Sequence, residues 1–275
     1  MIMEEAILNR KGATKVSEIP TEILQFLNQG NLESVNLTEW LAINHIELLH
    51  NVLPLIGLKD SLDFITSELK KQNVETGMKV IRMTGALLDQ VILHESEEKK
   101  EEILVYFCNH ISDSIRCWAA FMNKSSNDTL EAKLKYIRPF AADRHFGVRE
   151  IAWMSIREDL SLNIEKSVDL LVDWAKNEDE NIRRFSVESI RPRGVWCKHI
   201  EILKQEPDRA LPILTLLKSD SSKYVQDSVG NWLNDASKTK PDWVINLCDE
   251  WAKDTDIKST HRIIKKAKRT IMKNK

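Results

Sequence analysis

The chain has 275 residues, of which 42% are apolar and 30% are charged. This balance is ordinary for a soluble globular protein, and it excludes a disordered chain. No apolar stretch approaches the length of a bilayer span, so a membrane protein is not expected. The net charge of −2 excludes a polycation. Charge is nevertheless uneven, because residues 258–275 hold eight Lys or Arg and no Asp or Glu. Such an end fits either a nucleic-acid-facing edge or a solvated basic tail.

Turn-forming residues are few, with eight glycines and seven prolines, and alternating β-type runs are scarce. The sequence therefore predicts an all-α chain. Thr38 is the expected cap of a helix that Pro54 and Gly57 end. After a helical lead-in over residues 1–20, we expect helices at 21–30, 38–52, 60–72, 76–93, 96–110, 112–123, 128–140, 147–158, 164–176, 180–190, 196–204, 208–218, 222–236, 240–252 and 259–273.

A short motif recurs at the start of several of these helices. A β-branched residue followed by Arg or Gln opens an apolar run at Ile115-Arg116, Val148-Arg149, Ile182-Arg183 and Val225-Gln226, with spacings of 33, 34 and 43 residues. A candidate fifth start is His261-Arg262-Ile263. Helix pairs this thin cannot bury their own apolar faces, so they stack into a curved solenoid with a concave surface. No linker rich in Pro, Gly or Ser divides the chain, and we expect one domain over residues 1–275, with N-terminal helices in 1–110 and repeats in 111–275.

The four cysteines, Cys108, Cys117, Cys197 and Cys248, have no disulfide-framework spacing. Two of them belong to Cys-x-His patterns, at Cys108 and Cys197, but these patterns lie far apart. Zinc sites generally need four ligands in a recognisable spacing. We therefore expect no metal and a reducing, cytoplasmic setting.

Residues 182–235 carry the most unusual combination of side chains in the chain. A helix that starts at Ile182 cannot continue through Pro192, which lacks an N–H donor and whose ring clashes with the preceding turn. The connection that follows, Arg193 to Trp196, should push an arginine and an indole out of a helix end. Core packing alone does not require an arginine and an indole to project from a helix end.

Basic residues of this region suit contacts with phosphates, each of which releases counterions. The alternative for each residue is a solvated surface charge. The candidate backbone-binding residues are Arg149, Arg183, Arg184, Arg193, Lys198 and Lys238.

Carboxylates and indoles lie among these basic residues. Glu188 shares a helix face with Arg184 and Arg191, which would also fit an intrahelical ion pair. Asp235 lies on one face with Asn231 and Trp232, which would also fit a network at a helix C-terminus. Exposed indoles can bind a cation through the π face. Aromatic and anionic groups within a basic surface suggest a ligand with both phosphate and a positively charged ring.

Two strings of this region resemble the AlkC branch of the bacterial AlkC/AlkD DNA glycosylases. They are Arg183-Arg184-Phe185-Ser186-Val187-Glu188 through Arg191-Pro192-Arg193-Gly194-Val195-Trp196, and Ser228-Val229-Gly230-Asn231-Trp232-Leu233-Asn234-Asp235-Ala236-Ser237-Lys238. The resemblance is strong over about residues 140–252 and weaker before them. It implies a right-handed α-solenoid of HEAT-like repeats with a concave, DNA-facing surface. Some members of the family carry an immunoglobulin-like domain at the C-terminus, which we do not expect here.

The resemblance also implies the activity. We expect a DNA N-glycosylase of base excision repair that removes cationic N-alkylated bases of the 3-methyladenine class, without cofactor or metal. Its substrate would be double-stranded DNA and its setting the bacterial cytoplasm, at the nucleoid when acting. A monomer is expected.

The family's site residues transfer to matching positions of this chain. Catalytic carboxylates would be Asp235, with Glu188 and Glu150 in support, and lesion contacts would come from Trp196, Trp153 and Trp232. The family's upstream acidic position falls on Trp153 in strict register, while Glu150 lies one turn earlier on the same helix face. Either Glu150 supplies that carboxylate or the site has one acid fewer. A carboxylate would stabilise the oxocarbenium-like sugar and align the attacking water.

A second interpretation remains open, namely a non-catalytic HEAT-repeat protein that binds DNA or serves as a scaffold. Solenoids host many functions, so the fold does not decide between them. Carboxylates inside a basic, aromatic motif favour the enzyme, because a plain phosphate binder gains nothing from negative charge.

Overall fold

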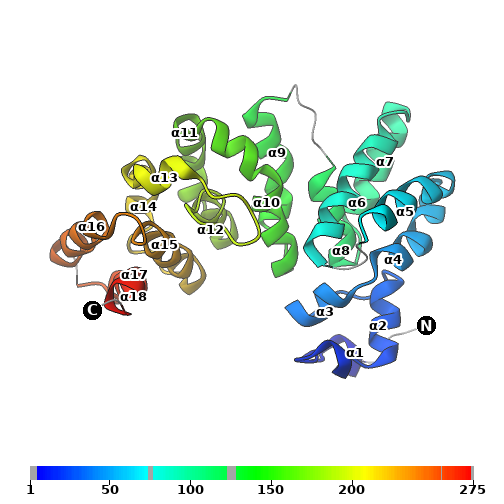
Figure 1. Ribbon diagram of the computed structural model, residues 1–275, viewed down its shortest axis with the longest axis horizontal. Helices are drawn as coiled ribbons and strands as arrows, with labels where there is room; N and C mark the ends of the chain where they lie inside the picture. Colours follow the sequence, from blue (N-terminus) through cyan, green and yellow to red (C-terminus); the bar gives the residue numbers. More distant parts are fainter. Residues whose placement is uncertain (1–4, 74–76, 123–127, 255, 274–275) are drawn as a thin grey trace. The chain divides into compact units, whose positions relative to one another are not determined.

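The computed structural model describes residues 5–73, 77–122, 128–254 and 256–273, and each regular element in these ranges is a helix (Figure 1). The all-α prediction is confirmed. The described chain forms two compact units. Unit 1 comprises the described residues up to Asp128 together with Arg144–Ile151, and unit 2 comprises Thr129–Asp143 and the described residues from Ala152 onward. The single domain, the handedness of the solenoid and the concave surface stay predictions.

Unit 1 consists of short α-helices with 3₁₀ turns between them. The α-helices are α1 (Glu5–Leu8), α2 (Thr21–Asn28), α3 (Leu37–Ala42), α4 (His45–Val52), α5 (Leu62–Lys71), α6 (Gly77–Ile92), α7 (Glu97–Cys108) and α8 (Asp113–Phe121). The 3₁₀ turns are η1 (Val16–Glu18), η2 (Leu53–Ile56) and η3 (Lys59–Ser61).

The single helix expected over 38–52 is wrong, because the chain forms α3 and α4 there. The Asn44 side chain accepts hydrogen bonds from the backbone N–H groups of Ile46 and Glu47 at 3.0 and 3.1 Å, and so caps a new helix. The cap of α3 is also not Thr38. It is Asn36, whose Oδ1 accepts from the Glu39 N–H at 2.9 Å.

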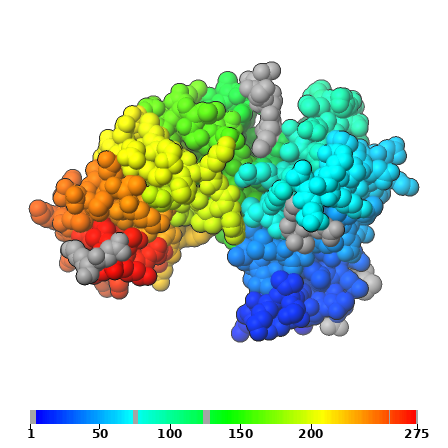
Figure 2. All heavy atoms as spheres, in the orientation of Figure 1, coloured from blue at the N-terminus to red at the C-terminus, as the bar shows by residue number. Residues whose placement is uncertain are grey.

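Unit 2 begins with α9 (Leu130–Ala141) and takes the part of α10 (Phe146–Leu162) from Ala152 onward. Its further elements are α11 (Ile164–Ala175), α12 (Glu180–Glu188), α13 (Glu201–Gln205), η4 (Pro207–Ala210), α14 (Leu211–Leu216), α15 (Lys223–Ala236), α16 (Pro241–Asp254), α17 (Lys258–Ala267) and α18 (Arg269–Lys273). Helix α15 packs against both α12 and α17. In Figure 2 the atoms of α16 to α18, orange to red, lie together at the C-terminal end of unit 2.

Two predicted helices of unit 2 differ from the structure. The helix expected at 196–204 begins only at Glu201, because residues 189–200 form an irregular connection, here named the site loop. The helix expected at 259–273 is interrupted at Lys268, which separates α17 from α18.

The repeated Arg or Gln of the sequence motif has a common structural role in the fold. It donates to backbone carbonyls of the turn five and six residues before it, which satisfies polar groups that the helix ends leave open. The bonds are Arg116 Nη1 to the carbonyls of His110 and Ile111, Arg183 Nη1 to those of Asn177 and Glu178, Gln226 Nε2 to those of Asp220 and Ser221, and Arg149 Nη1 to that of Arg144. The periodicity seen in the sequence therefore marks a device that fixes the turn within a helix pair.

Candidate functional site

The site loop connects α12 to α13 in unit 2, and a buried arginine of α10 holds it in place. Arg157 donates from Nη1 to the carbonyl of Ser189 at 2.8 Å and from Nε to that of Lys198 at 3.2 Å. Its Nη2 donates to the carbonyl of Arg191. Burial lowers the pKa of Arg157 from its usual value. One side chain therefore fixes three points of a loop that has no regular structure.

Gly194 and Trp196 set the local path of this loop. A Cβ atom on Gly194 would overlap the sulfur of Cys197 and lie 3.1 Å from Cζ of Arg157, so a larger residue does not fit without rearrangement. Trp196 has a φ of 58°, in the left-handed region that non-glycine residues rarely adopt. Its side chain is 53% exposed and follows the exposed Val195. The prediction that Pro192 and Gly194 project this indole agrees with its exposure.

Two carboxylates from different helices meet at the start of the loop. Glu188 is the last residue of α12 and Asp235 lies near the end of α15, and both are buried. Arg191 joins them. Its Nη1 donates to Oε1 of Glu188 at 2.6 Å, while Nε and Nη2 donate to Oδ2 of Asp235 at 3.0 and 2.7 Å.

Opposite charge keeps Glu188 ionised in this buried position. Burial alone raises the pKa of a carboxyl group, but the guanidinium groups of Arg184 and Arg191 outweigh it and lower the pKa of Glu188 below its usual value. The pKa of Arg191 is raised, because its attraction to Glu188 and Asp235 exceeds the effect of burial, which lowers it. The carboxylate and the guanidinium are thus both charged at neutral pH.

Further cations surround the pair. Lys238 donates to Oδ1 of Asp235 at 2.9 Å, and Nη2 of Arg184 lies 3.7 Å from Oε2 of Glu188. The guanidinium of Arg184 also lies over the ring of Tyr224, 4.3 Å from its centroid. The two carboxylates therefore have three cationic neighbours within ion-pair distance.

The other two tryptophans predicted as lesion contacts are buried in unit 2. Trp232 donates from Nε1 to the carbonyl of Ile190 at 3.0 Å and so fixes the start of the site loop from the core side of α15. Trp153 lies under Arg157, whose Cζ is 5.9 Å from the ring centroid. Neither offers an open indole face in this conformation, whereas the indole of Trp196 is exposed.

The predicted phosphate contacts fall into two groups. Arg183 pairs with Asp220, with Nε 2.6 Å from Oδ2, in addition to its turn carbonyls, and Arg149 holds the turn at Arg144. Arg184 is buried, as described above. In contrast, Lys198 is 94% exposed and only loosely paired with Glu158 at 3.6 Å. Arg193 is partly exposed, and its buried Nε lacks a hydrogen-bond partner among the described atoms.

Glu150 lies three residues before Trp153 on α10, but it belongs to unit 1. Its support of the carboxylate pair in unit 2 remains a proposal. Trp153, which falls on the family's upstream acidic position in strict register, is a buried indole and supplies no carboxylate.

The comparison with protein families finds a match over residues 150–266 to the family described as DNA alkylation repair enzyme. This segment holds the site loop, Arg157 and both carboxylates of the pair. The resemblance to alkylation repair enzymes thus extends over a segment somewhat shorter than half of the chain. The family expected from the sequence strings is thereby confirmed.

Relatives of the chain include an uncharacterized protein of Bacillus subtilis, YhaZ. It is 41% identical over 123 residues, which are 43% of this chain and 33% of YhaZ. The chain thus spans about a third of that relative's length. Among solved structures, the alkylpurine DNA glycosylase AlkC of Pseudomonas fluorescens, bound to DNA containing an abasic site analog, is similar with a TM-score of 0.68 and 22% identity, over 95% of this chain and 66% of AlkC.

AlkD2 of Streptococcus mutans is similar with a TM-score of 0.58 and 23% identity, over 75% of this chain and 97% of AlkD2. At these levels of identity, the two solved structures show that the fold is shared. They agree with the helix-pair organisation predicted from the sequence motif.

Arg191 and Arg157 are two residues of this site that the sequence did not predict as site residues, although Arg191 was named as a possible ion-pair partner of Glu188. A signal for Arg191 existed, since it lies three residues after Glu188 and so within reach on the same face. Its bonds to Asp235, however, link positions 44 residues apart. For Arg157 the partners are backbone carbonyls, which no residue pattern displays.

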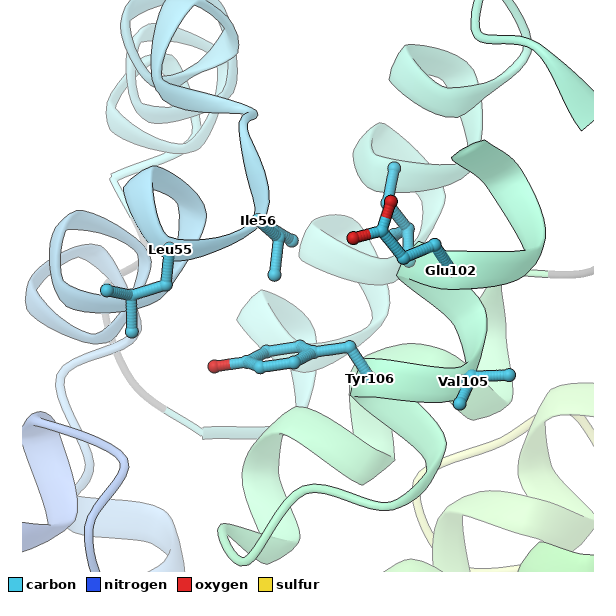
Figure 3. Close-up of a pocket in the computed structure, with 6 residues that line it drawn as sticks. Leu55, Ile56, Glu102, Val105 and Tyr106 are labelled. Atoms are coloured by element: carbon cyan, nitrogen blue, oxygen red, sulfur yellow. The ribbon is translucent and has the colours of Figure 1, made fainter. Parts of the chain in front are cut away.

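A pocket with a volume of about 300 Å³ lies in unit 1, between η2 and α7. Figure 3 shows Tyr106 and Glu102 of α7 pointing toward Leu55 and Ile56 of η2. The lining is mainly apolar, and Glu102 already accepts from Lys99 at 2.8 Å. It offers no pair of charged groups comparable to those of the site in unit 2.

Within the described ranges, no three or more His, Cys, Asp or Glu side chains come together where they could hold a metal ion. In the same ranges, no helix has the length and apolar character to cross a membrane.

Proposed function

We propose that this protein is a DNA N-glycosylase that excises positively charged N-alkylated bases of the 3-methyladenine class from duplex DNA. The observation that carries the proposal is the buried pair of Glu188 and Asp235, joined through Arg191 of the site loop, which also holds the exposed indole of Trp196. The family match over residues 150–266 supports it. The fold shared with AlkC, whose solved structure contains DNA with an abasic site analog, supports it further. The protein would act as a monomer in the bacterial cytoplasm, with neither cofactor nor metal.

The chemistry suits these groups. In an N-alkylated purine the ring already carries a positive charge, so the base can leave without a proton from the protein. When the N-glycosidic bond breaks, its electron pair goes to the base, which becomes neutral, and the sugar becomes an oxocarbenium-like cation. A carboxylate near C1′ stabilises that charge. It then accepts a proton from the water that attacks C1′ and forms the new C–O bond.

Asp235 is the proposed catalytic carboxylate, and Glu188 supports it. Each carboxylate oxygen has two lone pairs. Oδ2 accepts two hydrogen bonds from Arg191, whereas Oδ1 accepts one from Lys238 and can also face a second positive centre. Trp196 would contact the lesion through its exposed face, where a cation gains about 1–2 kcal/mol when desolvated. Arg193 and Lys198, on the same loop, would bind the DNA backbone.

The test is to incubate the purified protein with methylated duplex DNA and to identify the released bases. We expect release of cationic alkylpurines, with a single-turnover rate at least about a hundredfold lower for Asp235→Asn. Asp227→Asn is the matched control on the same helix, since Asp227 pairs with Lys266 and Arg262 instead of Arg191. Equal rates for Asp235→Asn and Asp227→Asn would remove Asp235 as the catalytic carboxylate.

A non-catalytic DNA-binding protein is the second candidate, and one observation favours it. Around the two carboxylates lie three cations, Arg184, Arg191 and Lys238, which would also suit a bound phosphate. The same experiment separates the two functions. Tight binding of methylated DNA without release of any base would establish the binding protein.

A further inference from the structure

Arg191 occupies a position that neither helix could provide. The Glu188 carboxylate projects from the end of α12 and the Asp235 carboxylate from α15, so the two acids belong to separate elements. Arg191 lies beyond the end of α12, where the site loop begins, and reaches both with three N–H groups. A guanidinium can do this because its N–H groups are fixed in one planar fork, whereas a lysine ammonium is a single point charge.

The backbone of Arg191 is held as firmly as its side chain. Its carbonyl accepts from Nη2 of Arg157, and Trp232 donates to the carbonyl of the preceding Ile190 at 3.0 Å. The side chain of Arg191 is mostly buried. A shift of the guanidinium would break its contacts with α12 and α15, and a shift of the Arg191 backbone would break the contact with α10.

The charged groups that face the two acids come from each of these elements. They are Arg157 of α10, Arg184 of α12, Arg191 of the site loop and Lys238 just after α15. Arg184 contacts Glu188 and Lys238 contacts Asp235. Arg191 is the cation that contacts both acids. Without a cation between them, two buried carboxylates close together would repel each other or take up a proton.

We propose that Arg191 is a positioning residue, which locks Glu188 and Asp235 into one geometry for the reaction. This inference rests on the proposed glycosylase function. Arg191 itself does not touch the sugar or the base. Its action passes through the two acids, and its charge helps to keep the pKa of Glu188 below the usual value.

The experiment compares Arg191→Ala, Arg191→Lys and the natural protein in single-turnover excision across pH. In Arg191→Ala we expect the rate at neutral pH to fall about a hundredfold, since misplaced groups cost about that much. The acid limb of its pH profile should move to higher pH, because loss of the cation makes protonation of Glu188 easier. In Arg191→Lys the acid limb should stay near its natural position while the rate remains low, because one ammonium cannot reproduce the fork.

Added guanidinium ion at non-denaturing concentration should restore part of the activity of Arg191→Ala, since it fits the space that the side chain leaves. Arg209→Ala is the matched control. Arg209 also contacts two carboxylates of unit 2, Glu165 and Glu206, but lies away from the site loop. Its removal should leave the pH profile unchanged.

A readout that needs no catalysis completes the test. The side-chain carboxyl resonance of Glu188, assigned by comparison with Glu188→Gln, is titrated by ¹³C NMR in each variant. We expect the titration of Glu188 in Arg191→Ala to move to higher pH. If the titration and the shape of the pH profile both stay unchanged while only the melting temperature falls, Arg191 is merely structural and the inference is overturned. If the natural protein releases no base but the titration moves, the proposed function fails while the positioning of the acids by Arg191 stands.

Discussion

At the scale of single residues, the tryptophans show how burial separates roles that the sequence could not. Three indoles were predicted to meet the lesion, and they share the same local signal of an aromatic residue in a repeat. Only Trp196 follows a proline break and a glycine, which is a physical reason for exposure, and it is the exposed one of the three. Trp153 and Trp232 lie on regular helices, where a large apolar side chain turns to the core.

Trp196→Ala should therefore lower excision much more than stability. Loss of the indole face should reduce the single-turnover rate on cationic lesions roughly ten- to thirtyfold, which corresponds to about 1–2 kcal/mol. Alanine retains the cost of the left-handed backbone at φ 58°, so the variant tests the indole alone. Melting temperature and excision are measured on one preparation.

Trp232→Ala provides the contrast, because truncation of a buried tryptophan costs about 3–5 kcal/mol of stability. We expect a large fall in its melting temperature. A comparably large fall for Trp196→Ala, with residual activity equal to the folded fraction, would make Trp196 structural.

At the scale of elements, most helices were predictable because their apolar periodicity and breakers are local. The errors arose where a polar side chain decides a boundary. Asn44 starts α4 within what looked like one apolar run, and Asn36 caps α3 in place of Thr38. The site loop is the largest deviation, since residues 196–200 were expected to be helical. Its path depends on Arg157, whose partners are backbone carbonyls remote in sequence.

Arg157→Met should loosen the site loop while the helices persist. Methionine fills the buried space but donates no hydrogen bonds, so the carbonyls of Ser189, Arg191 and Lys198 lose their shared donor. We expect faster hydrogen exchange of amides within residues 193–199, unchanged far-UV circular dichroism, and excision reduced about tenfold or more.

Arg138→Met is the control for this variant. Arg138 lies over the ring of Trp174 in unit 2, 5.2 Å from its centroid, and does not contact the site loop. It should leave exchange in residues 193–199 unaltered. If the loop amides of Arg157→Met exchange as slowly as those of the natural protein, other contacts suffice to hold the loop.

At the scale of the whole molecule, the sequence predicted an all-helical chain and its repeat starts, because the spacing of the motif reflects one repeated contact. The sequence could not predict which basic residues bind the carbonyls of a turn and are therefore not free for phosphate. Arg183 was expected to bind phosphate, yet its guanidinium holds a turn and pairs with Asp220. The net charge of −2 gives no general attraction to DNA. The proposed affinity for DNA would therefore come from local cations, of which Arg193 and Lys198 on the site loop are the clearest candidates.

This charge distribution makes the salt dependence of DNA binding a sharp test for Arg193. The logarithm of the binding constant falls with the logarithm of salt concentration by about 0.9 for each phosphate contact. Arg193→Ala should weaken binding to damaged and undamaged duplexes alike, and it should reduce the slope by about one.

Lys176→Ala is the control, because Lys176 is an exposed cation of unit 2 that pairs with Asp173 at 3.4 Å and lies outside the site loop. Its slope should match that of the natural protein. If Arg193→Ala weakens binding to damaged DNA alone and keeps the natural slope, then Arg193 contacts the lesion, and the backbone contacts must lie elsewhere among the exposed lysines.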